Sequence, residues 1–220
     1  MKKFVVALLI SLIPLGSMRR FFYRVLMGYT IPASSRIGFM SVIAVSKFQL
    51  GKGVQIGILN LFKGPIEVRI GDNSRIGKLN KFTCAWHIMQ AKFSSMNYTP
   101  ILDFGKSTLV LDEHFFDVYG KITLGDGTWV AGHGSEFWTH GLSTMDRDIT
   151  IGEQNYIGSA VRFAPGTTIG SRNVVALGSV VMSKLTCDAN LISGVPAKPF
   201  RSIEDDLKKG KYRFSFDDWS

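Results

Sequence analysis

Apolar residues recur at every sixth position through the C-terminal part of the chain. The positions are Ile151, Ile157, Phe163, Ile169, Val175 and Val181. The residue after each of them is nearly always small, as in Gly152, Gly158 and Gly170. An α-helix does not keep one face at a period of six, and a flat strand repeats every second residue. The pattern therefore predicts a coil with flat sides.

We interpret each six-residue unit as one side of a triangular prism, with three units in each coil. The large aliphatic residue points into the lumen and stacks on its equivalent one coil away, and the small residue lies at the corner. Each coil buries its apolar side chains against the next coil, so several coils are needed for stability. The sequence thus predicts an all-β solenoid.

The same pattern occurs earlier in the chain, with breaks. Further units begin at Ile37, Ile43, Ile56, Ile70, Ile76, Phe82, Leu124 and Val130. The spacing is interrupted at residues 58–69 and 83–108. The second interruption predicts a long excursion from the prism, which is either a functional loop or a lid over an exposed face.

The phase of the repeat also breaks near a histidine. Counted from Val130, units should begin at residues 136, 142 and 148, but the next one begins at Ile151. Three extra residues predict a loop over residues 135–148, which contains His140. A histidine in such a loop is exposed and titrates near neutrality, as a general base must. The alternative is an ordinary surface or packing histidine.

The other histidines and the cysteines carry weaker signals. His133 lies within a repeat unit and is expected on an exposed side face, whereas His87 and His114 show no clear spacing. Cys84 and Cys187 have no metal-binding spacing and lie among apolar repeat positions. We expect buried thiols in a reducing compartment.

The first 30 residues are apolar and basic. Lys2 and Lys3 precede an apolar stretch at 4–15, which is too short to span a membrane and has no Ala-x-Ala cleavage site after it. Residues 19–29 mix arginines with large apolar side chains, which is typical of a helix in a membrane interface. The alternative is a cap on the end of the solenoid or a contact with a neighbouring subunit.

Composition and charge narrow the picture. The 220 residues are 45% hydrophobic and 20% charged, which indicates one folded domain with short additions. The net charge of +9 favours anionic partners such as phosphate groups or lipid. No RRM, KH, helix-turn-helix or zinc-finger pattern is present, so we expect no nucleic acid. We expect a helical segment at 1–30, the solenoid at 31–200, and a C-terminal helix and tail at 201–220.

Residues 122–200 resemble the hexapeptide-repeat acyltransferases, nearest to sugar and polysaccharide O-acetyltransferases of the maltose and galactoside acetyltransferase type. ITLGDGTWVAGHGSEFWTHG (122–141) is similar to their strands and loop histidine. The segment 149–181 is similar to two complete coils, and SGVPAKPFRSI (193–203) to their closing motif beside the coenzyme. The resemblance implies a left-handed parallel β-helix, a homotrimer with active sites between prisms, acetyl-CoA as co-substrate, and no metal.

The resemblance also implies residue roles. His140 is the general base, the backbone N–H of Ser159 stabilises the oxyanion, and Asp117 and Trp138 contact the acceptor. Asp117 is alternatively a plain corner residue of the prism. The coenzyme is expected to contact Ser159, Leu177, Gly178, Ser179, Lys184, Lys198 and Arg201, with the cations near its phosphates. Lys184 fits with a shift of one residue, because Met182 and Ser183 replace the usual Thr before it.

No partner that would orient His140 can be identified from the sequence, and Glu136, Asp146 and a backbone carbonyl are all open. The predicted activity is direct acetyl transfer to a sugar hydroxyl in surface-polysaccharide or glycan synthesis, in the cytoplasm or at the inner face of its membrane. The alternatives are N-acetylation of an amino sugar and a non-catalytic scaffold. A zinc enzyme of the γ-class carbonic anhydrase type would need three converging histidines, for which the spacing is wrong.

Overall fold

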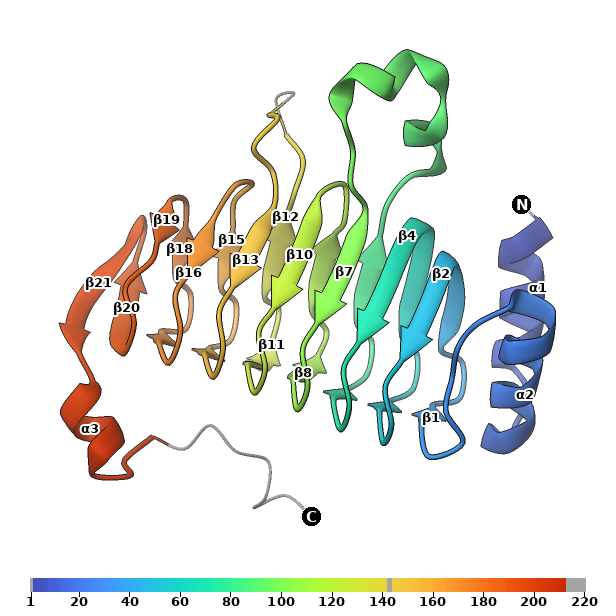
Figure 1. Cartoon of the computed structure of the whole chain (residues 1–220), viewed down its shortest axis with the longest axis horizontal. Helices are drawn as coiled ribbons and strands as arrows, with labels where there is room; N and C mark the ends of the chain where they lie inside the picture. Colours follow the sequence, from blue (N-terminus) through green and yellow to red (C-terminus); the bar gives the residue numbers. More distant parts are fainter. Residues whose placement is uncertain (1, 142–143, 213–220) are drawn as a thin grey trace.

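The computed structural model describes residues 2–141 and 144–212, and these form a three-sided parallel β-helix (Figure 1). Strands of successive coils pair in parallel in two sheets of 9 and 12 strands. The larger sheet bends around a corner because β4 (Leu61–Ile70) pairs with β6 through its first half and with β7 through its second half. The two sheets therefore make three faces, which confirms the predicted prism.

Each face contains one strand from each coil. The first face consists of β1 (Arg36–Ile37), β3 (Gln55–Ile56), β5 (Arg75–Ile76), β8 (Leu109–Asp112), β11 (Trp129–His133), β14 (Tyr156–Ile157), β17 (Val174–Val175), β20 (Asn190–Gly194) and the antiparallel β21 (Ala197–Ser202). The second face consists of the first halves of β2 (Val42–Leu50) and β4, then β6 (Lys81–Thr83), β9 (Phe115–Asp117), β12 (Glu136–Trp138), β15 (Arg162–Phe163) and β18 (Val180–Val181). The third face consists of the second halves of β2 and β4, then β7 (Ile101–Phe104), β10 (Lys121–Leu124), β13 (Ile149–Ile151), β16 (Thr168–Ile169) and β19 (Lys184–Leu185).

The predicted lumenal residues form the core. All six repeat positions from Ile151 to Val181 are at most 1% exposed. On the second face the lumenal column is aromatic, and neighbouring rings stack at centroid distances of 4.3, 4.7, 4.2 and 4.8 Å through Phe62, Phe82, Phe116, Phe137 and Phe163. Stacked aromatic rings bury much area and fix the register between coils.

The corners explain the small and polar positions of the repeat. A Cβ atom on Gly125 would lie 2.5 Å from the backbone of Gly152, so close coil-to-coil approach excludes a side chain there. The buried Asn155 donates from its side chain to the carbonyl of Gly170 at 2.8 Å, and its Oδ1 accepts from the N–H of Asn173 at 2.8 Å. Such ladders satisfy backbone groups that the turns leave unpaired.

The two interruptions differ from their predicted form. Residues 58–69 do not leave the prism, because β4 continues through them and a shift of strand register accommodates the extra residues. In the second interruption the excursion is limited to about 84–98, with short 3-10 helices η1 (Trp86–Met89) and η2 (Ala91–Met96). The chain is back on the third face by Ile101.

The predicted loop at 135–148 is also shorter. Residues 136–138 form β12 with Phe137 in the lumen, so the loop comprises residues 139–148. Sequence counting gave the surplus of residues but not its position, because β12 lies in register with β9. Leu142 and Ser143 lie outside the described residues.

Two helices, α1 (Lys2–Ser11) and α2 (Gly16–Met27), cover the first coil (Figure 1). Tyr23 is fully buried and donates to the carbonyl of Ser41 at 2.8 Å, and the buried Arg19 donates to the carbonyl of Ile37. The helices therefore cap the prism. Within the described residues, no helix has the length and apolar character needed to cross a membrane.

At the other end, β21 leads into α3 (Glu204–Lys208). Its first turn contains three acidic residues and its last turn a lysine, as predicted from the helix dipole. The aromatic tail at 213–220 lies outside the described residues.

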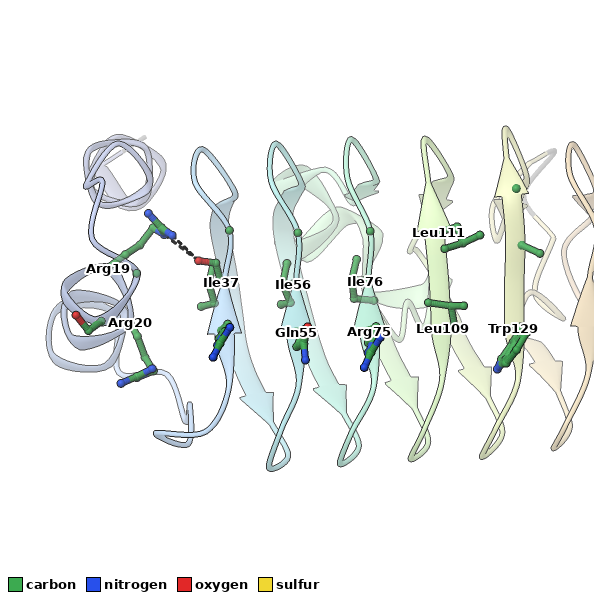
Figure 2. Close-up of a pocket in the computed structure, with 18 of the residues that line it drawn as sticks. Arg19, Arg20, Ile37, Gln55, Ile56, Arg75, Ile76, Leu109, Leu111 and Trp129 are labelled. Carbon is green, nitrogen blue, oxygen red and sulfur yellow. Dashed lines mark hydrogen bonds between the residues drawn. The ribbon is translucent and has the colours of Figure 1, made fainter. Parts of the chain in front are cut away.

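A groove of about 800 Å³ runs along the outside of the first face, beginning at α2 (Figure 2). Side chains from successive strands line it, among them Gln55, Arg75, Leu109 and Trp129.

Candidate active site

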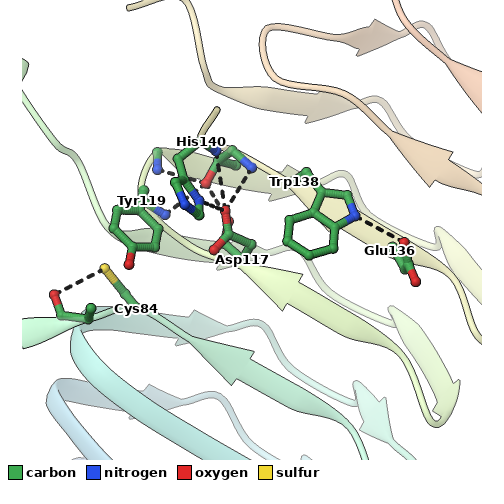
Figure 3. Close-up of polar contacts among 9 residues, drawn as sticks. Cys84, Asp117, Tyr119, Glu136, Trp138 and His140 are labelled. Carbon is green, nitrogen blue, oxygen red and sulfur yellow. Dashed lines mark hydrogen bonds and ion pairs between the residues drawn. The ribbon is translucent and has the colours of Figure 1, made fainter. Parts of the chain in front are cut away.

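His140 and Asp117 form a close pair at the corner between the second and third faces. β9 ends at Asp117 and β12 at Trp138, and these two residues are partners in the parallel ladder. The chain leaving β12 therefore passes directly over Asp117, and the Nδ1 atom of His140 lies 2.5 Å from its Oδ2 atom (Figure 3).

The carboxylate of Asp117 is buried and well bonded. It is 3% exposed, and its Oδ2 atom also accepts from the backbone N–H groups of Thr139 at 3.3 Å and His140 at 3.2 Å. Burial raises the pKa of Asp117, and the hydrogen bonds from His140 and Thr139 act in the opposite direction. An ionised Asp117 accepts the Nδ1 proton and leaves Nε2 of His140 unprotonated, which is the form a general base needs.

The imidazole is accessible as well as oriented. The side chain of His140 is 45% exposed, whereas that of Asp117 is 5% exposed. One face of the imidazole stacks on Tyr119, with centroids 4.1 Å apart and planes at 28°. Thr139 fixes the neighbouring turn, since its hydroxyl oxygen accepts from the N–H groups of Tyr119 at 2.7 Å and Gly120 at 3.0 Å.

Cys84 lies beneath Tyr119 (Figure 3). It is buried, and burial raises the pKa of its thiol to about 12. A thiol with this pKa stays protonated near neutrality and is a poor nucleophile. Cys187 is a free thiol too, but it is half-buried rather than buried as predicted.

The residues expected to orient His140 are engaged elsewhere. The carboxylate of Glu136 accepts from the indole of Trp138 at 3.0 Å and from Arg162 at 3.1 Å. Asp146 pairs with Lys184 at 2.9 Å. Both candidates were wrong, and the orienting residue is Asp117, which the sequence had placed against the acceptor.

A signal for this pair was present in the sequence. Phe116 and Phe137 are lumenal equivalents one coil apart, so the residues after them are neighbours. Counting that register would have placed Asp117 beside Trp138 and within two residues of His140. It was missed because the excursion at 84–98 separates Phe116 from the regular repeats.

Trp138 lies on the outer surface of the second face. It is 37% exposed, and its ring packs on Phe115 with a centroid distance of 4.9 Å. It is therefore available at the surface beside the Asp117–His140 pair, and its predicted contact with the acceptor stays a prediction.

The predicted coenzyme residues gather at a different corner. Ser159 precedes β15 and Gly178 precedes β18, so both lie between the first and second faces, and the N–H of Gly178 donates to the carbonyl of Ser159 at 2.9 Å. Leu177 is 78% exposed and Ser179 is buried. The second face separates this corner from His140 within one chain.

The predicted phosphate-binding cations are spread further. Lys198 and Arg201 are exposed on β21, where Arg201 pairs with Asp206 at 2.8 Å. Lys184 lies on the third face and pairs with Asp146, so it is separated from Ser159 as well. Within the residues the structure describes, no three His, Cys, Asp or Glu side chains converge as metal ligands.

Comparison with known proteins gives one sequence match. The chain is 40% identical to galactoside O-acetyltransferase of Escherichia coli K12 over 57 residues, which are 26% of this chain and 28% of that enzyme. The match confirms the resemblance over this stretch, but the chain aligns with well under half the length of the curated relative. No protein-family model matches the chain.

Solved structures of related shape are more distant. An N-acyltransferase from Bacillus cereus, solved with dTDP and 3-hydroxybutyryl-CoA, has a TM-score of 0.49 at 13% identity, covering 84% of this chain and 89% of that one. A hexapeptide-repeat acetyltransferase from Vibrio cholerae, solved with acetyl coenzyme A, has a TM-score of 0.44 at 21% identity, covering 93% and 87%. A polysialic acid O-acetyltransferase has a TM-score of 0.40 at 15% identity, covering 84% and 95%.

Proposed function

We propose that this protein transfers an acetyl group from acetyl-CoA to a hydroxyl group of a sugar, with His140 as the general base. The observation that carries the proposal is the pair formed by an accessible imidazole and a buried carboxylate. A scaffold has no need to orient a histidine in this way. The 57-residue identity to galactoside O-acetyltransferase supports the reaction class.

The reaction follows from the geometry of the pair. Nε2 of His140 accepts the proton of the acceptor hydroxyl as its oxygen attacks the thioester carbonyl. Asp117 stabilises the imidazolium that forms, because its carboxylate lies 2.5 Å from Nδ1. The tetrahedral intermediate then expels the CoA thiolate, which takes the proton from His140. The protonated, buried Cys84 takes no part, so transfer is direct.

We further propose that the complete site forms between two chains of a homotrimer. His140 lies at one corner, while Ser159 and Leu177–Ser179 lie at another, and the second face stands between them. A neighbouring prism would bring its Ser159 N–H and its exposed Leu177 towards His140. The Ser159 amide would then stabilise the oxyanion, and Leu177 would border the pantetheine arm.

We also propose peripheral contact with a membrane through α1 and α2. Their outer surfaces expose Leu9, Leu12, Phe21, Val25 and Leu26 at between 46% and 63%. Exposed basic residues, including Lys2 and Arg24, stand beside these apolar side chains. This combination fits a surface of anionic lipid, at which a lipid-linked sugar acceptor would be available.

Replacing His140 tests the catalytic proposal. We expect His140→Ala to lower kcat by about two to four orders of magnitude, since a general base contributes that much, with little change in acetyl-CoA binding. Turnover is measured with labelled acetyl-CoA against nucleotide sugars and lipid-linked oligosaccharides, and binding by calorimetry. His133→Ala, on the exposed end of β11, is the matched control. Near-normal turnover in His140→Ala would sink the assignment.

A further inference from the structure

The loop that carries His140 is held from below by a buried arginine. Arg147 is 3% exposed, and its Nη2 atom donates to the carbonyl of Thr144 at 2.6 Å within the same loop. Its guanidinium carbon lies 4.5 Å from the ring centroid of Tyr98, at the end of the other excursion. Arg147 therefore joins two segments that are about 50 residues apart in the sequence but leave the prism at the same corner (Figure 1).

This arginine is costly to bury. Its Nε and Nη1 atoms are buried and have no hydrogen-bond partner. A buried cation with unpaired donors loses its hydration without full compensation, and the contact with the Tyr98 ring returns part of that loss. An apolar side chain of similar length would fill the same space at lower cost. Stability alone therefore does not account for an arginine at this position.

The contacts continue from Arg147 to the catalytic pair. The ring of Tyr98 meets the ring of Tyr119 edge to face, with centroids 5.5 Å apart and planes at 68°. Tyr119 in turn stacks on the imidazole of His140 at 4.1 Å. The N–H of Thr99 donates to the carbonyl of Tyr119 at 3.1 Å, which ties the first excursion to the same turn.

Gly120 makes room for this arrangement. A Cβ atom there would lie 2.6 Å from Cγ of Arg147 and 2.8 Å from a carboxylate oxygen of Asp148. Its φ angle is not in the left-handed region, so the backbone itself would accept alanine. The absence of a side chain serves the passage of Arg147 rather than a turn.

We propose that Tyr119, Tyr98 and Arg147 form a positioning cluster for His140, an inference that rests on the proposed role of His140 as the base. Tyr119 fixes the plane of the imidazole so that Nδ1 meets Asp117 and Nε2 faces the acceptor. Its π face also stabilises the imidazolium formed during the reaction. Tyr98 and Arg147 hold Tyr119 and the loop in place without touching the acceptor. Small displacements of a base cost large factors in rate, which gives the cluster its purpose.

Arg147→Met separates positioning from stability. Because the arginine is costly to bury, we expect the melting temperature of Arg147→Met to be unchanged or higher. We expect kcat to fall about tenfold or more, with the KM for acetyl-CoA within about twofold. Arg172→Met, at an exposed ion pair with Glu204 away from the loop, is the matched control. A lower melting temperature, or an unchanged kcat, would overturn the proposal.

The aromatic link is tested at Tyr119 with a conservative rescue. Tyr119→Phe keeps the stacked ring, so we expect kcat within about twofold of the wild type. Tyr119→Leu removes the π face, and we expect a fall in kcat of about tenfold or more. Gly120→Ala should behave like Arg147→Met, because it displaces that side chain. Equal activity of Tyr119→Phe and Tyr119→Leu would contradict a positioning role.

Amide hydrogen exchange keeps this test separate from the catalytic proposal. The N–H of His140 bonds to Asp117, and we expect Arg147→Met to raise exchange in residues 139–148 but not in the coils at 149–181. If His140→Ala retains full turnover, the proposed function fails whatever the exchange shows. If His140→Ala is inactive but Arg147→Met leaves loop exchange unchanged, the cluster alone is refuted.

Discussion

At the residue scale, His114 occupies a corner position that is asparagine in two preceding coils. The Oδ1 atom of Asn60 accepts from the N–H of Asn80 at 3.0 Å, and that of Asn80 accepts from the N–H of His114 at 2.9 Å. Nδ1 of His114 then accepts from the N–H of Ser135 at 3.0 Å, which requires the neutral imidazole. Burial lowers the pKa of His114 from 6.5 to about 4.

This histidine makes stability depend on pH. Because its pKa is lower in the folded state, unfolding takes up a proton between about pH 6.5 and pH 4. The free energy of unfolding should therefore fall as the pH falls through this window, by up to about 3 kcal/mol. His114→Asn restores the residue of the preceding coils and should remove this contribution, as thermal unfolding at pH 7.5 and pH 5 will show. His133→Asn is the control, and an unchanged pH slope in His114→Asn would refute the assignment.

At the element scale, the N-terminal helices have two different sides. Their inner side closes the prism through buried residues such as Ala7, Ile10 and Tyr23, so the predicted cap is present. Their outer side exposes apolar residues that closing the prism does not require. The same pair of helices can therefore serve as a cap and as a membrane contact, and the two readings of residues 1–30 are compatible.

The membrane contact is testable on α2. Phe21 and Val25 are 55% and 61% exposed and lie one helical turn apart. We expect replacement of both by serine to weaken binding to phosphatidylglycerol vesicles about tenfold, because less apolar surface enters the lipid. Cosedimentation measures the binding, and higher salt should weaken it further. Phe200→Ser, at the opposite end of the prism, is the control. Equal vesicle binding by wild type and double variant would argue against the contact.

At the scale of the whole molecule, one chain contains two incomplete halves of a site. His140 and Asp117 occupy one corner, and Ser159 and Gly178 occupy another. A trimer with closed symmetry would join unlike corners of neighbouring chains three times over.

This arrangement predicts complementation between inactive variants. Gly178→Asp places a negative charge where the coenzyme is proposed to pass, and its φ of +70° is a conformation that aspartate tolerates. We expect His140→Ala and Gly178→Asp to be inactive alone. After unfolding and refolding together in equal amounts, they should recover about a quarter of wild-type activity, the share of sites with both halves intact. No recovery in mixtures that do form mixed trimers would place the whole site within one chain.

The sequence by itself determined the solenoid. A lumenal residue at every sixth position is a local rule, because each side of the prism needs one apolar side chain inside and little room at the corner. For the same reason the excursion near residue 90 and a loop carrying His140 could be predicted. The helix at 204–208 followed from its acidic first turn and basic end.

The tertiary structure decided which residues meet across coils. Asp117 precedes His140 by 23 residues, and only the register of β9 against β12 places its carboxylate under the imidazole. Glu136 and Asp146 were closer in sequence but face other partners. The separation of His140 from Ser159 had the same cause. Contacts between coils depend on the number of residues in every intervening turn, and the excursion at 84–98 and the extra residues at 58–69 change that number. A repeat pattern therefore fixes what a coil is, while the sum of its irregularities fixes which side chains become neighbours.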